Sequence, residues 1–279
     1  MLLGKHEVSA LSPDEIYDSI SEDVALVSLS HTDFRTSTVR DMQAITERAH
    51  EKGALVLWDL SHSVGVMPLR VDELDVDFAV GCTYKYLNGT AGCPGFVYMN
   101  EKHHEGFQPK VVGWLGHDKP FSFEAGYRPA SGVQSLHTGT QAVLTMQNLG
   151  GSLKDFKGVD MADLRRYGAQ LTGELIERVP ALIPGSKCLT PTEPHNRGGH
   201  VAIWHEEAEY ISRALIGHAH VITDFRAYGE KGGFFRLCPH PLYTNFADID
   251  RTCDLIEEVV SEGIYKRKKY CGARKTKVS

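Results

Sequence analysis

Short apolar runs alternate with an amphipathic stretch in the first hundred residues, and this alternation limits the possible folds more than any other feature. Met42, Ile45 and Ala49 recur at helical spacing, and Gly53 follows as a helix stop. Four apolar runs around this stretch have the length of buried strands: VALVSL (24–29), ALVLW (54–58), DFAVG (77–81) and GFVYM (95–99). Strand, helix and strand in this order predict an α/β fold with a mainly parallel sheet and helices on both faces.

The pattern changes after about Gly150. A long amphipathic helix is expected first, ending near Pro180 and Pro184. The elements expected after it are a strand at 200–204, a helix near 206–216, a strand at 234–238 and a last helix capped by Thr244 or Asn245. We therefore expect part of a large domain at 1–150, a smaller α+β domain at 151–265 and a disordered basic tail at 266–279.

Composition excludes several classes of protein. The chain is 42% hydrophobic and can bury a full core, but its longest apolar runs fall far short of the roughly 20 residues that span a membrane. Six cysteines without CxxC spacing and 14 histidines without metal-ligand spacing argue against a disulfide framework and a metal site. The tail carries seven Lys and Arg residues with few aromatic neighbours, so nucleic-acid binding is not expected. A cytoplasmic location follows by default.

Polar residues directly after two apolar runs mark a candidate site, because ligands of open α/β sheets bind beyond the carboxyl ends of the strands. Asp59 follows the run at 54–58, and Lys85 follows the run at 77–81. A carboxylate and a lysine in these places suit pyridoxal 5'-phosphate (PLP), since the carboxylate keeps the pyridine nitrogen protonated and the amine bonds the cofactor aldehyde. Taken alone, the two residues also fit a surface ion pair.

Five stretches, in order along the chain, resemble the motifs of kynureninases, within the class-V, fold-type-I PLP-dependent family. They are WDLSHSVG (58–65), CTYKYLNGTAGCPGFVY (82–98), VVGWLGH (111–117), YRPASGVQSLHTGTQ (127–141) and FFRLCPHPLY (234–243). The glycines of the second stretch precede a strand and are spaced G-x-x-G-x-x-G, so they do not form a dinucleotide-binding motif. The resemblance implies a fold-type-I PLP transferase-like architecture and PLP as cofactor.

Applied residue by residue, the resemblance implies that Lys85 bonds PLP and that Asp59 pairs with the pyridine nitrogen. His62 would lie close to the cofactor ring, although it could instead cap a helix after the strand. Tyr84 is similar to the tyrosine that touches the phosphate and helps proton transfer, and Ser30 matches another position near the phosphate.

The remaining implied residues involve a second subunit and the substrate. Trp114 and Thr140 match positions that complete the phosphate site from the partner, which implies a homodimer. Arg236 matches the arginine that holds the substrate α-carboxylate. Two alternatives stay open, namely Trp114 as a core anchor and Arg236 as the ion-pair partner of Asp224 or Glu230.

The activity implied is hydrolysis of L-kynurenine or 3-hydroxykynurenine to anthranilate or 3-hydroxyanthranilate and L-alanine, in tryptophan catabolism. A different class-V enzyme, such as an aminotransferase, is the alternative; a cysteine desulfurase is expected to have histidine directly before the lysine, where this chain has Tyr84. The family segment that cradles the phosphate is expected to precede the first residue of this chain. Its absence predicts exposed strand edges and apolar patches, and a non-catalytic homologue remains a further alternative.

Overall fold

The computed structural model describes residues 13–229 and 231–272, which form two compact units. Unit 1 contains the described residues up to 31 together with 40–159, and unit 2 contains 32–39 together with those from 160 onward. The chain therefore divides after Val159 and not near Gly150. The helix at 143–152 stays with unit 1 because the Ser152 hydroxyl donates to the Asn88 carbonyl at 2.8 Å.

The segment 32–39 joins unit 2 through main-chain hydrogen bonds that sequence patterns do not reveal. The Val39 N–H donates to the Asn196 carbonyl at 2.9 Å, and the Gly198 N–H donates to the Ser37 carbonyl at 2.6 Å. The segment thus belongs to unit 2 although it directly follows a strand of unit 1.

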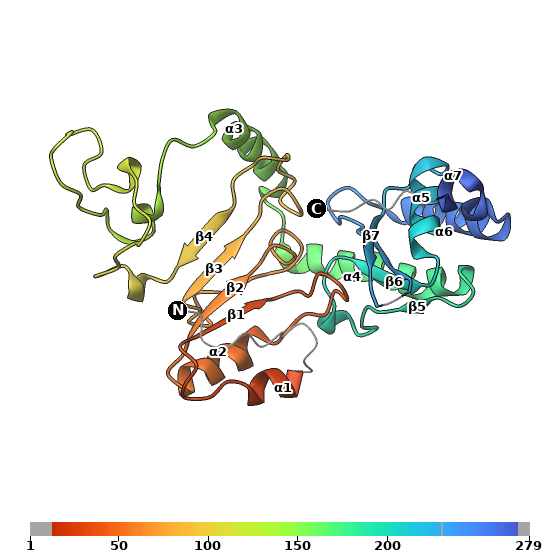
Figure 1. The fold of residues 1–279 in the computed structure, drawn as a ribbon, viewed down its shortest axis with the longest axis horizontal. Coiled ribbons are helices and arrows are strands. Elements are labelled where there is room, and N and C mark those ends of the chain that lie inside the picture. Colours follow the sequence, from red (N-terminus) through yellow and green to blue (C-terminus); the bar gives the residue numbers. More distant parts are fainter. Residues whose placement is uncertain (1–12, 230, 273–279) are drawn as a thin grey trace. The chain divides into compact units, whose positions relative to one another are not determined.

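Unit 1 is built on one four-stranded sheet in the order β1-β2-β3-β4 (Figure 1). Its strands are β1 (Leu26–Ser30), β2 (Leu55–Asp59), β3 (Phe78–Gly81) and β4 (Phe96–Met99). The first three run parallel and β4 is antiparallel to β3. A parallel β4 would need a crossover connection, and the loop between β3 and β4 contains no helix to supply one. The mainly parallel α/β sheet predicted from the sequence is confirmed.

The helices of unit 1 are short. They are α1 (Pro13–Asp18), α2 (Met42–Glu51), α3 (Val143–Ser152) and the 3-10 turns η2 (Glu101–His103), η3 (Trp114–Gly116), η4 (Gly132–Leu136) and η5 (Leu153–Phe156). The Asp41 side chain caps α2 by accepting from the Ala44 N–H at 2.9 Å. As the spacing predicts, Met42, Ile45 and Ala49 are buried, and they share a core with Trp58 of β2.

Unit 2 is an α+β unit with an antiparallel sheet in the order β5-β6-β8-β7. Its strands are β5 (Lys187–Cys188), β6 (Val201–His205), β7 (Asp224–Ala227) and β8 (Gly233–Leu237). Its helices are α4 (Met161–Leu182), α5 (Ala208–Gly217), α6 (Phe246–Ser261) and α7 (Lys268–Cys271), with the 3-10 turns η6 (Pro194–Asn196) and η7 (Ile264–Lys266). Asn245 caps α6 in a reciprocal capping box with Asp248, so one of the two proposed caps is confirmed.

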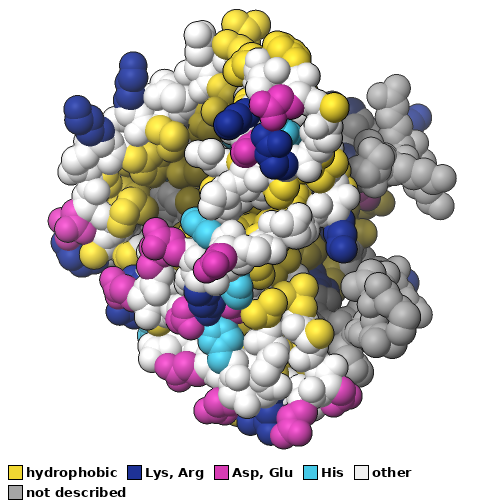
Figure 2. All heavy atoms as spheres, turned by 90° about the vertical axis from the view of Figure 1, so that its left-hand side faces the viewer, with side chains coloured by type: hydrophobic (Ala, Val, Ile, Leu, Met, Phe, Trp, Pro, Cys, Tyr) yellow, Lys and Arg dark blue, Asp and Glu magenta, His cyan; other side chains and the backbone are white. Residues whose placement is uncertain are grey.

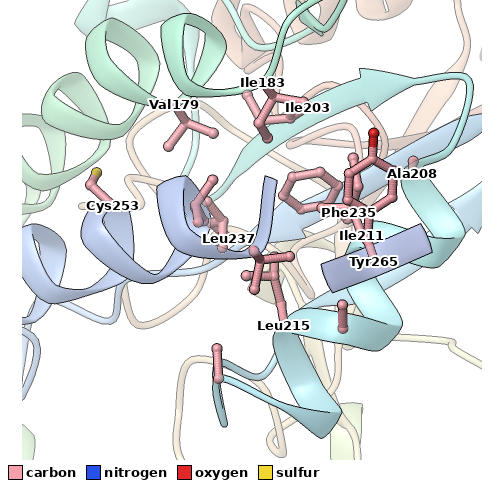
Figure 3. Close-up of a cluster of buried hydrophobic side chains, with 14 of the residues drawn as sticks. Val179, Ile183, Ile203, Ala208, Ile211, Leu215, Phe235, Leu237, Cys253 and Tyr265 are labelled. Atoms are coloured by element: carbon pink, nitrogen blue, oxygen red, sulfur yellow. The ribbon is translucent and has the colours of Figure 1, made fainter. Parts of the chain in front are cut away.

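Apolar side chains from the helices and the sheet of unit 2 interlock in one core. Figure 3 shows Val179 of α4, Ile211 of α5 and Phe235 of β8 among them. Phe235 is fully buried, so its ring takes the full benefit of removal from water.

The expectation of a disordered tail from residue 266 is wrong for residues 266–272. These residues include α7, in which the Tyr270 side chain is only 6% exposed and belongs to the core of unit 2. Arg213 donates from Nη1 to the Tyr270 carbonyl at 3.2 Å, which holds α7 to α5. The Tyr270 ring buries apolar surface in this core, and the many charged residues of the segment do not indicate such burial. Residues 273–279 lie outside the described residues.

Apolar side chains lie exposed along unit 1 in the connection between β4 and α3. Val111, Phe121 and Phe123 are 72%, 71% and 85% exposed, and Leu144 of α3 is 82% exposed. Figure 2 views the molecule from the side of this connection and shows hydrophobic side chains open to solvent on that face. The exposed apolar side chains expected from the sequence are therefore present along this connection. No helix within 13–229 and 231–272 has both the length and the hydropathy to cross a membrane.

Candidate active site

Three neighbouring parallel strands place the candidate residues of unit 1 at one edge of the sheet. In register, Ser30 at the end of β1 pairs with Asp59 at the end of β2, and Asp59 pairs with Val80 near the end of β3. Lys85 follows β3 by a few residues. The carboxyl ends of parallel strands meet at one edge, which explains how a serine, an aspartate and a lysine far apart in sequence come to the same edge of the sheet.

Asp59 is partly buried and oriented by the turn that follows it. Its Oδ1 accepts a hydrogen bond from the Ser61 N–H at 2.8 Å. Its second carboxylate oxygen makes no hydrogen bond to any residue of the described ranges, and this leaves an acceptor for an external N–H group.

Ser61 connects the Asp59 turn to the lysine loop. The Ser61 hydroxyl accepts from the Cys82 N–H at 3.1 Å, and Cys82 lies three positions before Lys85. Sequence reasoning did not assign Ser61 a role, and only its position beside Asp59 in the WDLSHSVG stretch could have indicated one.

The Lys85 loop is held by its own backbone and by the turn after β2. The Gly89 N–H donates to the Thr83 carbonyl at 2.9 Å, and the Thr83 hydroxyl donates to the Pro94 carbonyl at 2.6 Å. Gly65 has φ of +89°, and a Cβ there would lie 2.5 Å from the Tyr86 carbonyl oxygen. Only glycine lets this turn approach the residue beside Lys85 so closely.

The lysine side chain itself is available for chemistry. The Lys85 amine lies 5.6 Å from the centroid of the Tyr84 ring, and Tyr84 is 53% exposed. Within the described part of the chain, this amine forms no hydrogen bond or ion pair. The structure therefore does not contain a surface ion pair between Asp59 and Lys85, which was one of the two interpretations that the sequence left open.

Ser30 pairs in register with Asp59, and His62 follows Asp59 by three positions. His62 is in a turn, and no helix follows β2 directly, so the alternative role as a helix cap is wrong. The Ser30 carbonyl accepts from Nη1 of Arg40 at 2.8 Å. His31, which sequence reasoning overlooked, donates its N–H to the Asp59 carbonyl at 2.9 Å and packs edge-on against Trp58 at 5.9 Å between ring centroids.

Trp114 and Thr140 lie on the long connection between β4 and α3, which extends away from the sheet beyond the end of β4 (Figure 1). Trp114 is 46% exposed and packs edge-on against Phe121, with 5.6 Å between centroids. Thr140 is also exposed. Neither residue contacts Asp59 or Lys85 by a hydrogen bond or ring packing within the described residues. The role of Trp114 as a core anchor is wrong, since nearly half of its surface is open.

Arg236 belongs to unit 2, on β8. Its Nε donates to Asp224 Oδ2 at 2.7 Å, its Nη2 donates to the same oxygen, and its Nη1 donates to the Phe34 carbonyl at 2.7 Å. The pairing of Arg236 with Asp224, one of the open alternatives, is present, whereas Glu230 lies outside the described residues. No group of three or more His, Cys, Asp or Glu side chains in the described ranges is arranged to hold a metal ion.

Comparison with known proteins places the chain in a family. The model of the family described as "Aminotransferase class-V" matches residues 3–219, and the chain belongs to that family. Among curated proteins, the chain is 36% identical over 251 residues to a kynureninase of Pseudomonas fluorescens, covering 89% of this chain and 59% of that protein. A kynureninase of Burkholderia mallei is 32% identical over 250 residues, with the same two coverages. The resemblance to kynureninases that the motifs indicate is confirmed.

Solved structures confirm the predicted fold class. An apo cysteine desulfurase from Thermococcus onnurineus NA1 has a TM-score of 0.74 at 18% identity, covering 92% of this chain and 65% of its own. An alanine–glyoxylate aminotransferase from Nostoc sp. has a TM-score of 0.68 at 20% identity, covering 89% and 65%. At such identities the likeness shows the fold alone. The chain spans 59% of the length of the curated relatives it matches.

Proposed function

We propose that this chain is part of a PLP-dependent, kynureninase-like hydrolase acting on L-kynurenine or 3-hydroxykynurenine. The products would be anthranilate or 3-hydroxyanthranilate and L-alanine. The observation that carries the proposal is that Asp59 ends β2 and Lys85 closely follows the adjacent parallel strand β3, within motifs similar to those of kynureninases.

The residues present fit PLP. One Asp59 oxygen is available to accept from a protonated pyridine nitrogen, and the Lys85 amine is available to bond the aldehyde. PLP, when bound, supplies an electron sink for the bond that breaks. Bonding to the aldehyde uses the lone pair of the Lys85 nitrogen, and no hydrogen bond or ion pair to a described residue holds this amine elsewhere.

Each remaining residue has a task that its chemistry suits. Asp59 holds a proton at the pyridine nitrogen, and Lys85 removes and returns the substrate Cα proton. The hydroxyl of Tyr84, a residue that is 53% exposed, moves a proton to or from the substrate ketone oxygen as water adds there. Arg236 binds the substrate α-carboxylate with its planar fork of N–H donors. His62 and Ser30 lie beside the cofactor ring and phosphate in this proposal.

We further propose a homodimer with a shared site. Trp114 and Thr140 are exposed on the connection between β4 and α3, with Val111, Phe121 and Phe123 exposed along it. Burial of these apolar side chains against a second copy would bring Trp114 and Thr140 to the phosphate of the partner's site.

The test begins with the cofactor. The purified chain is incubated with PLP and reduced with borohydride, and the modified lysine is located by mass spectrometry. We expect modification of Lys85, its loss in Lys85→Ala, and its retention in Lys110→Ala, a matched control at an exposed lysine of the same unit. Modification spread evenly over surface lysines would refute the cofactor assignment.

Substrate is tested next with L-kynurenine, by following anthranilate fluorescence. Anthranilate release that depends on Lys85 supports a kynureninase-like hydrolase. Modified Lys85 without anthranilate would instead favour another class-V activity or a chain without catalysis. L-alanine formed from added pyruvate, with L-kynurenine as amino donor and no anthranilate released, would identify an aminotransferase.

A further inference from the structure

Arg236 lies in a charged group that the motif did not predict. Asp224 on β7 is the direct cross-strand partner of Arg236 on β8, and Arg226 lies two residues after Asp224 on the same face of β7. The Arg226 Nε donates to Asp224 Oδ2 at 3.1 Å, and its Nη2 lies 3.1 Å from Oδ1. Two arginines therefore share one carboxylate.

The hydrogen bonds fix the orientation of the Arg236 guanidinium. It has five N–H groups, of which three donate, two to Asp224 and one to the Phe34 carbonyl. One N–H on each terminal nitrogen is left, and a carboxylate bound in bidentate fashion can take one N–H from each of the two nitrogens. The Arg236 side chain is only 11% exposed, so few rotamers compete with this one.

The second partner of Arg236 is also rigid. The Phe34 carbonyl belongs to the segment 32–39, in which the Asp33 N–H donates to the Thr38 carbonyl at 2.8 Å. The Asp33 carboxylate, 7% exposed, accepts from the Arg35 N–H at 2.8 Å. This tight turn fixes the Phe34 carbonyl. Hydrogen bonds to a strand and to a loop therefore both hold the Arg236 guanidinium.

The charge balance favours an anion. A lone pair of Asp224 and Arg236 would be neutral, whereas two arginines and one aspartate carry a net charge of +1. Arg226 thus offsets the Asp224 charge, and Arg236 keeps its attraction for a negative group.

We propose that Asp224 is the positioning residue for substrate recognition: it orients Arg236 so that its two remaining N–H groups meet the α-carboxylate of an amino-acid substrate. The inference rests on the proposed function, which makes Arg236 the carboxylate site. Asp224 itself touches no substrate and acts only through Arg236.

Two measurements on the full 279-residue chain test the proposal. The first is the solvent-exchange rate of the Arg236 Nε–H, followed by ¹⁵N NMR and assigned through its loss in Arg236→Lys. The second is the affinity of the PLP-treated chain for L-alanine, by equilibrium dialysis. Asp224→Asn is expected to speed the exchange and to weaken L-alanine binding about tenfold, which corresponds to about 1.4 kcal/mol. Asp224→Glu, which restores the carboxylate, is expected to recover much of both effects.

The matched control is Asp250→Asn, which removes a carboxylate ion-paired to Arg178 at 2.5 Å in the same unit. It should change neither measurement, and circular dichroism checks that each variant folds. Unchanged L-alanine affinity in Asp224→Asn, in a chain that binds L-alanine, would overturn the inference while the proposed function stands. A wild-type chain that is not modified by PLP at Lys85 would overturn the proposed function; the exchange rate, which needs no cofactor, then decides whether Asp224 orients Arg236.

Discussion

Replacement of Asp77 with alanine is expected to destabilise unit 1 strongly. The Asp77 side chain is 1% exposed and lies just before β3, at the end of the strand opposite to Lys85. It accepts hydrogen bonds from the Val56 N–H at 2.9 Å, from His50 Nε2 at 2.8 Å and from His103 Nε2 at 2.7 Å, and Lys102 Nζ lies 3.0 Å away. One carboxylate therefore joins α2, β2, β3 and η2.

The size of the stability loss in Asp77→Ala depends on which of these donors water can reach once the carboxylate is removed. Val56 is 1% exposed, so its N–H would lose its acceptor without replacement, at a cost of about 1–3 kcal/mol. The side chains of His50, His103 and Lys102 are 29%, 23% and 35% exposed, and water partly replaces the carboxylate there. Each of these three interactions then contributes at most about 1 kcal/mol. We expect a total loss of about 3–4 kcal/mol in the free energy of unfolding.

Urea unfolding followed by tryptophan fluorescence measures the effect, because Trp58 lies in the core of unit 1. Asp72→Ala is the matched control: the Asp72 carboxylate accepts from the Tyr98 hydroxyl at 2.6 Å but lies near the surface, and its loss should cost less than about 1 kcal/mol. A loss below about 1 kcal/mol in Asp77→Ala would refute the reasoning, since it would mean that the buried carboxylate does not hold these elements together.

The contribution of Asp77 to the free energy of unfolding depends on pH with a definite sign. Burial by itself raises the pKa of Asp77, but hydrogen bonds from His50, His103, the Val56 N–H and Lys102 outweigh burial and hold the pKa far below its usual value. A carboxylate whose pKa is lower in the folded state adds stability above its unfolded pKa of about 3.9, and that stability is lost as the pH falls through the folded pKa. The stability difference between the wild type and Asp77→Asn should therefore shrink as the pH falls below about 4.

Three further changes test local features. Gly65→Ala should destabilise unit 1 by more than about 1 kcal/mol in urea unfolding and reduce PLP modification of Lys85, because φ is positive and the new Cβ would meet the Tyr86 carbonyl; unchanged stability would contradict the close approach. Asn245→Ala should lower the free energy of unfolding by about 1 kcal/mol through loss of the α6 cap. Burial raises the pKa of the Cys253 thiol, which is 2% exposed, so iodoacetamide should label it in the native chain far more slowly than it labels exposed Cys238; equal labelling would argue against the packing of α6.

Local patterns predicted the scaffold of the site because its elements depend on residues close together in sequence. The apolar runs of β1 to β4 appear within one or two residues of their observed ends. Asp59 is the last residue of β2 and Lys85 lies four positions after β3, and the carboxyl edge of a parallel sheet is a known place for ligands. The motif matches then identified the family that the comparisons confirm.

Local sequence patterns do not predict contacts between residues that are far apart along the chain. The charge of the tail and its position after the last expected helix predict disorder, whereas Tyr270 of α7 is buried in the core of unit 2 and α7 is hydrogen-bonded to α5. The segment 32–39 joins unit 2 because Ser37 and Val39 meet residues 196–198, more than 150 positions along the chain.

The sequence by itself determined the elements, their order, the family and the candidate cofactor residues, since each is encoded in local spacing and in motifs. Only the tertiary structure decided that Asp77 collects its donors from three elements, α2, β2 and η2, and that Asp224 faces both Arg226 and Arg236. The physical reason is strand register: a shift of one residue between β7 and β8 would turn Arg236 to the other face of the sheet, and register is set by the packing of whole elements.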